Sequence, residues 1–155
     1  MDAINQPLLN VRDLSVAFHQ PSGTSLAVDR ISFEIKRGEC VALVGESGSG
    51  KSVSALSVLK LLPYPTASHP SGSIQFKGNE LLGMSEREMR GIRGNDISII
   101  FQEPMTSLNP LHTIESQIGE ILQLHHGVGG QMARERTLEL LTQVGIPDPQ
   151  TRLKS

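Results

Sequence analysis

The chain has 155 residues, a mass of 16.8 kDa and a net charge of −2, from 14 Lys and Arg against 16 Asp and Glu. This length suits one domain or part of a larger one, and the composition is neither highly charged nor poor in Leu, Ile and Val, which excludes a disordered chain. The absence of a basic surplus gives no support for a protein that coats nucleic acid. The single cysteine, Cys40, excludes an internal disulfide, and no apolar run approaches the roughly 20 residues of a membrane-spanning helix.

The first third of the chain predicts strands that lead into a glycine-rich loop. Alternating apolar and polar residues indicate strands at Leu8–Phe18 and Leu26–Ile35, with a turn between them. The short apolar run Cys40–Val44 follows a tight turn and predicts a strand buried on both faces, with Cys40 as a small core residue. A buried helix is expected over Lys51–Leu62, which contains no helix breaker.

The middle of the chain alternates between loops and short elements. Three prolines, at positions 63, 65 and 70, predict an irregular link after the helix. Alternation at Ser73–Lys77 indicates a short strand, and the capping box at 85–88 predicts the start of a short helix. The apolar run Ile97–Phe101 predicts a second fully buried strand.

The last third predicts helices. Apolar residues recur at helical spacing from Ile114 to Leu122, and Gly127–Gly130 ends that amphipathic helix. A second helix is expected over Gln131–Val144, closed by Gly145. These elements predict an α/β core up to about Gln102, followed by an α-helical segment.

One motif carries the clearest chemistry. The sequence GESGSGKS, from Gly45 to Ser52, matches G-x-x-x-x-G-K-[ST] in full. Its glycines let successive backbone amides point inward, so that these amides and the following helix N-terminus cradle nucleotide phosphates. Lys51 is expected to reach the β- and γ-phosphates, and the Ser52 hydroxyl to ligate Mg²⁺. The motif is shared by GTPases, kinases, helicases and transport ATPases, although the chain lacks the Asn-Lys-x-Asp that reads guanine.

A second string narrows the class. About fifty residues after the loop, residues 100–110 read IFQEPMTSLNP. Together with GESGSGKS, this string resembles the nucleotide-binding subunits of ABC transporters, in particular the bacterial importers of di- and oligopeptides, nickel and glutathione. The resemblance covers the chain from about Leu8 to Ser155. It implies an incomplete ABC ATPase domain over 8–155: an antiparallel β-subdomain and P-loop core at 8–102, and the start of a helical subdomain at 103–155.

The resemblance also implies roles for individual residues. Phe18 matches the aromatic residue that stacks on adenine, and Phe can replace Tyr because stacking needs only a flat π-face. Gln102 matches the glutamine that touches Mg²⁺ and the attacking water and senses the permease, so that Lys51 and Gln102 are the expected catalytic residues. Ser52 and Gln102 are the expected metal ligands. The expected nucleotide contacts are Phe18, Gly45, Glu46, Ser47, Gly48, Ser49, Gly50, Lys51, Ser52 and Gln102.

Several motifs of that family do not occur in these 155 residues. The signature Leu-Ser-Gly-Gly-Gln, the Walker B strand with its Asp-Glu, and the H-loop histidine are all missing. Since these groups position Mg²⁺ and polarise water, we expect the chain alone to bind MgATP weakly and not to turn it over. The intact protein is expected to work at the cytoplasmic face of the bacterial inner membrane, as a head-to-tail dimer with permease subunits and, indirectly, an extracytoplasmic solute-binding protein.

Three other readings remain open at this stage. A small-molecule kinase would need an acid–base constellation beyond the P-loop, and none is evident. A non-catalytic truncated product or nucleotide-binding interaction module agrees with every motif present. A non-transport ABC protein would have no reason to keep the peptide-importer string.

Overall fold

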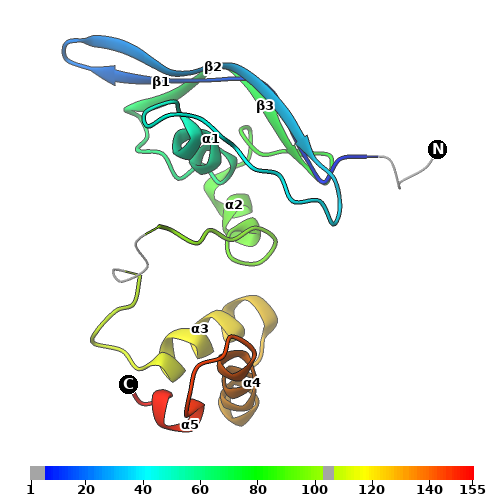
Figure 1. Ribbon diagram of the computed structural model, residues 1–155, viewed down its shortest axis with the longest axis vertical. Helices are drawn as coiled ribbons and strands as arrows, with labels where there is room; N and C mark the ends of the chain where they lie inside the picture. The colour runs from blue at the N-terminus through cyan, green and yellow to red at the C-terminus, as the bar shows by residue number, and fades with distance from the viewer. Residues whose placement is uncertain (1–5, 103–106) are drawn as a thin grey trace. The chain divides into compact units, whose positions relative to one another are not determined.

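The computed structural model describes residues 6–102 and 107–155. It forms two compact units, Met1–Ile97 and Ser98–Ser155 (Figure 1). The first unit holds an antiparallel sheet and two helices, and the second is helical. The α/β class, the antiparallel β-subdomain and the start of a helical subdomain are therefore confirmed.

Four strands form the sheet of the first unit. They lie in the order β2-β1-β3-β4, with β1 at Leu9–Gln20, β2 at Gly23–Ile35, β3 at Ala67–Phe76 and β4 at Asn79–Glu80. All three pairings are antiparallel. The two long N-terminal strands were expected (Figure 1). The buried residues of the sheet come mainly from β1 and β3.

A buried serine joins three of these strands. The Ser15 hydroxyl on β1 accepts a hydrogen bond from the Arg30 amide on β2 at 3.0 Å and lies 2.9 Å from the Ser71 hydroxyl on β3. The adjacent Gly72 has φ +109°, and a Cβ there would lie 2.5 Å from the Leu14 Cα. The backbones of the paired strands β1 and β3 therefore approach each other so closely here that position 72 requires glycine.

β3 begins earlier than expected. The predicted strand was Ser73–Lys77, whereas the observed strand starts at Ala67 and includes Pro70. Pro70 lies where the β1–β3 register shifts, between the pairs Ser15↔Ser71 and Ala17↔Ser68. A proline lacks the amide that a regular ladder needs, and an irregularity accommodates it.

Helix α1 spans Lys51–Val58 and is four residues shorter than predicted. It ends because Lys60 adopts φ +50°, with the Leu61 amide donating to the Leu56 carbonyl at 3.0 Å. The Lys60 ammonium donates to the carbonyls of Leu82 at 3.0 Å and Met84 at 2.7 Å. These contacts with a segment twenty residues away outweigh the propensity of the sequence to continue the helix.

Arg93 closes the same end of α1. Its guanidinium donates to the carbonyls of Leu59 at 2.8 Å and Lys60 at 3.1 Å, and it pairs with Glu86. The hydrogen bond from Arg93 is the largest cause that lowers the pKa of Glu86. Arg93 follows α2, Glu86–Ile92, which begins with the predicted capping box of Ser85 and Glu88.

Two predicted strands are wrong. Cys40–Val44 and Ile97–Phe101 form no strand, apart from an isolated bridge at Ile97, and their side chains are largely exposed. The exposed fraction reaches 92% at Val44 and 93% at Ile100, and Cys40 is exposed rather than in the core. A strand buried on both faces needs hydrogen-bonding neighbours and covering layers, and the described residues provide neither at these segments.

The described residues of the second unit form three helices. α3 spans Ile114–His126, α4 spans Gly130–Gln143 and α5 spans Pro149–Arg152. The first two were predicted, and α3 begins at the Thr113 cap and ends at Gly127, which has φ +66°. The short α5 was not predicted. After it, the carbonyls of Leu153 and Ser155 accept hydrogen bonds from the first amides of α3. Within the described residues, no helix has the length and apolarity to cross a bilayer.

One half-buried histidine, His69, is expected to make the stability of the first unit depend on pH. His69 on β3 is half-buried, and its Nε2 has no hydrogen-bond partner among the described residues. Burial, and then the charge of Lys60, lower the pKa of His69. A histidine with a lowered folded-state pKa is more easily protonated in the unfolded chain. The free energy of unfolding is therefore highest above the pKa of His69 in the unfolded chain, about 6.5, and falls as the pH drops below that value.

We predict that the free energy of unfolding, measured with urea, is lower at pH 5.5 than at pH 7.5. His69→Gln should reduce this loss, because glutamine does not titrate in this range. His126→Gln, at an exposed position of the second unit, is the control. A pH dependence that is unchanged in His69→Gln would contradict the prediction.

Candidate phosphate-binding loop

The glycine-rich loop lies between the tight turn at 36–39 and α1. Gly48 and Gly50 have φ values of +80° and +87°, and Gly50 is the N-cap of α1. A Cβ at Gly50 would lie 2.7 Å from the Ala27 carbonyl oxygen and 2.9 Å from Val28 Cγ2, both on β2. The loop was expected to follow a strand, but it is instead positioned by α1 and by this close approach to β2.

The start of α1 presents free amides. The amides of Lys51, Ser52 and Val53 donate no hydrogen bond within the described residues. They carry the positive end of the helix dipole, which favours an anion. A hollow of about 170 Å³ lies here, lined by Ala27, Gly48, Ser49, Gly50, Lys51, Ser52 and Val53. This volume is below the roughly 300–1,000 Å³ of pockets that bury drug-sized ligands, and it suits the phosphate part of a nucleotide.

Sequence reasoning did not predict that Ala27 would line the hollow beside the loop. It lies more than twenty residues before Lys51, on β2, and it lines the hollow. No local pattern marks it, because it reaches the loop only through the path of the sheet.

Lys51 is fully engaged by its own loop. Its ammonium donates to the carbonyl oxygens of Gly45 at 2.7 Å and Glu46 at 2.6 Å and to the Ser49 hydroxyl at 3.1 Å. These contacts fold the side chain back over the loop. The positive charge is thereby held against the loop, and Lys51 also lines the hollow at the start of α1.

Ser52 fits a Mg²⁺ ligand. Its side chain is exposed on the first turn of α1, and its hydroxyl forms no hydrogen bond within the described residues. A hard oxygen of this kind suits Mg²⁺, which keeps several waters and takes its remaining ligands from the substrate phosphates. No group of three or more His, Cys, Asp and Glu in the described part of the chain could hold a metal by itself.

The two other predicted contacts lie outside the loop. Phe18 is half-buried on β1, opposite Ser25 of β2 and Ala67 of β3. Gln102 is exposed and belongs to the second unit, whereas the loop belongs to the first. The motif beside Gln102 includes residues 103–106, which lie outside the described residues. The adenine-stacking role of Phe18 and the catalytic role of Gln102 stay predictions.

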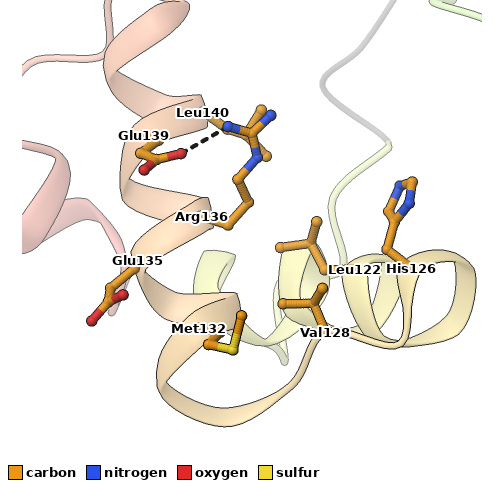
Figure 2. A pocket seen from close by; sticks show the side chains of 8 residues that line it. All are labelled: Leu122, His126, Val128, Met132, Glu135, Arg136, Glu139 and Leu140. Atoms are coloured by element: carbon orange, nitrogen blue, oxygen red, sulfur yellow. Dashed lines mark hydrogen bonds and ion pairs between the residues drawn. The ribbon is translucent and has the colours of Figure 1, made fainter.

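A separate apolar groove lies in the second unit. It measures about 500 Å³, and Figure 2 shows the side chains of α3, α4 and their link that line it. Leu122, Val128 and Met132 form its apolar part, while Arg136 and Glu139 pair at 2.7 Å on α4 (Figure 2). The groove has none of the phosphate-binding features of the loop.

Comparison with known proteins decides the family. The profile of the ABC transporter family matches residues 28–155. This chain belongs to the ABC transporter family. The sequence is 69% identical to the peptidoglycan transport ATP-binding protein YejF of Agrobacterium fabrum. This match covers 97% of the chain and 28% of that protein. It is 49% identical over 94% of its length to the dipeptide transport ATP-binding protein DppD of Escherichia coli, covering 44%.

The fold agrees with that of solved ABC cassettes. The dimeric MJ0796 cassette matches with a TM-score of 0.79 at 22% identity, over 94% of this chain and 60% of the cassette. The same cassette bound to ADP and Pi matches with a TM-score of 0.76 at 21% identity. The chain thus has part of an ABC ATPase fold and spans between about a quarter and a half of the curated relatives it matches.

Gly50 offers a test of how the loop is positioned. We predict that Gly50→Ala lowers the free energy of unfolding by about 2–3 kcal/mol, because it combines a strained positive φ with overlap against the Ala27 carbonyl. Gly48→Ala is a matched control, since it has a similar φ but no atom within 4 Å of the added Cβ. It should cost about 1 kcal/mol. Equal losses in urea unfolding would show that the contact with β2 does not constrain the loop.

Proposed function

We propose that this chain is the ATP-binding part of an ABC importer that uses ATP hydrolysis to take up peptides or a similar small solute. The single observation that supports ATP binding best is the loop at 45–52, which combines the Lys51 ammonium, held by loop carbonyls, with free amides at the start of α1. The solute class is supported by the relatives, which are transport ATP-binding proteins for peptidoglycan and dipeptides.

The loop residues would divide the work by their chemistry. The Lys51 ammonium would neutralise charge on the β- and γ-phosphates, and the amides of α1 would bind phosphate oxygens. Ser52 would hold Mg²⁺ against the same phosphates. Phe18 would stack on adenine, and Gln102 would contact Mg²⁺ and the attacking water. The bound metal ion would supply charge neutralisation at the transferred phosphoryl group.

The 155-residue chain alone is proposed to bind MgATP weakly and not to hydrolyse it. Its sequence contains the P-loop but neither the signature motif, nor the Walker B carboxylates, nor the H-loop histidine. Phosphate binding without the groups that position water gives affinity but little rate.

The proposed partners follow from the family. A second nucleotide-binding domain would complete the ATP site head-to-tail, as the existence of a dimeric related cassette suggests. Permease subunits would receive the resulting motion at the cytoplasmic face of a bacterial inner membrane, and an extracytoplasmic binding protein would deliver the solute. No nucleic acid is proposed as a partner.

Lys51→Met tests the ATP-binding proposal. Because a hydrogen-bonded charge contributes about 1.5–3 kcal/mol, the variant should weaken MgATP binding about 10–100-fold in isothermal titration. Lys36→Met, at an exposed position on the turn after β2, is the control and should bind like the unmodified protein. MgATP binding that is unaltered in Lys51→Met would refute the proposal.

A non-catalytic truncated product or nucleotide-binding interaction module is the second candidate. It requires only the P-loop, which these 155 residues contain. The intact mass of the protein in its own cells separates the two candidates. A product well above 16.8 kDa supports the importer ATPase, and one of 16.8 kDa supports the second candidate.

A further inference from the structure

The hydrogen bonds that Lys51 makes within its loop occupy all three hydrogens of its ammonium group. An ammonium group carries three N–H donors and no acceptor. Three acceptors lie within reach: the carbonyl oxygens of Gly45 and Glu46 and the Ser49 hydroxyl. A phosphate oxygen can therefore bind Lys51 with full strength only if one of these three contacts is released.

The Ser49 side chain lies on the inner side of the loop. A Cβ at Gly45 would lie 2.7 Å from Ser49 Oγ and 3.4 Å from Ser49 Cβ, so the space that glycine leaves open at position 45 is the space that Ser49 approaches. The Ser49 amide also donates to the Glu46 carbonyl at 3.3 Å. Ser49 thus spans the loop from its first residue to Lys51.

The three contacts differ in how easily they can be exchanged. The carbonyl oxygens belong to the loop backbone, and their distances to Lys51 Nζ are 2.7 and 2.6 Å. The Ser49 contact is longer, at 3.1 Å, and comes from an exposed side chain that can rotate about one bond. A neutral hydroxyl is also a weaker partner for a cation than a charged phosphate oxygen.

We propose that the Ser49 hydroxyl is a placeholder for the nucleotide phosphate. It holds the Lys51 ammonium in position, and on ATP binding a phosphate oxygen takes its place while the two backbone contacts remain. This proposal deepens the proposed function and rests on it. Ser49 is accordingly a positioning residue that acts on the nucleotide through Lys51.

A placeholder and a direct phosphate ligand predict opposite changes in ATP affinity when the Ser49 hydroxyl is removed. If Ser49 only bound phosphate, removing its hydroxyl would weaken ATP binding. If Ser49 competes with phosphate for Lys51, removing the hydroxyl frees a donor and tightens ATP binding. Removing the hydroxyl also leaves the Lys51 side chain less restrained before nucleotide binds.

The test compares Ser49→Ala with the unmodified intact protein that carries this sequence. Acetylation of lysines by acetic anhydride without nucleotide, followed by mass spectrometry, reports the accessibility of Lys51 relative to Lys36. We expect Ser49→Ala to raise this ratio about threefold and to tighten ATP binding about threefold to tenfold, the scale of one hydrogen bond to a charge. Ser49→Cys, with a weaker acceptor of similar shape, should give smaller changes in the same directions.

Each other result of the labelling and binding measurements would contradict one step of the proposal. An unchanged labelling ratio would show that Ser49 does not hold Lys51. A raised ratio with weaker ATP binding would show that the hydroxyl binds phosphate and is not displaced. If the unmodified protein bound no ATP, the proposed function would fail, which is distinguishable from normal binding that does not respond to Ser49→Ala.

Discussion

The close contact between Gly50 and the Ala27 carbonyl is the constraint on which the candidate site depends. It joins the glycine-rich loop to β2 at the point where α1 begins, and only a residue without a Cβ permits it. The free amides of α1 and the Lys51 ammonium take their positions from this contact. The other end of α1 is held by Lys60 and Arg93, so that the helix is fixed at both termini.

The sheet holds β2 in place for that contact, and its strands approach one another closely at two residues. Ser15 links β1, β2 and β3 through its hydroxyl, and Gly72 brings β3 against the backbone of β1. The β1–β3 ladder is irregular on both sides of Ser15. The sheet that carries Ala27 thus depends on residues that lie outside the candidate loop.

The charge of Lys51 explains why the glycine-rich loop keeps its shape. A glycine-rich segment has high conformational freedom, and ordering it costs entropy. Lys51 offsets this cost by binding the carbonyls of Gly45 and Glu46, which would otherwise repel a phosphate. One side chain thereby closes the loop and covers its negative dipoles, and an incoming anion meets a prepared site.

The sequence alone determined the features that depend on neighbouring residues. It predicted the glycine-rich loop before α1, the β1–β2 hairpin, the Ser85 capping box and the helices α3 and α4, because glycine conformation, alternation and capping act over a few residues. The family also followed from sequence, through two motifs about fifty residues apart.

Only the tertiary structure decided the features that depend on distant partners. Lys60 and Arg93 ended α1 early, and Cys40–Val44 formed no strand because apolar character does not supply a neighbour to pair with. The approach of Ala27 to Gly50 and the enclosure of Lys51 by three acceptors likewise arise from chain path and side-chain geometry. Such contacts leave no periodic signal in a single sequence, since their energy depends on residues brought together by folding.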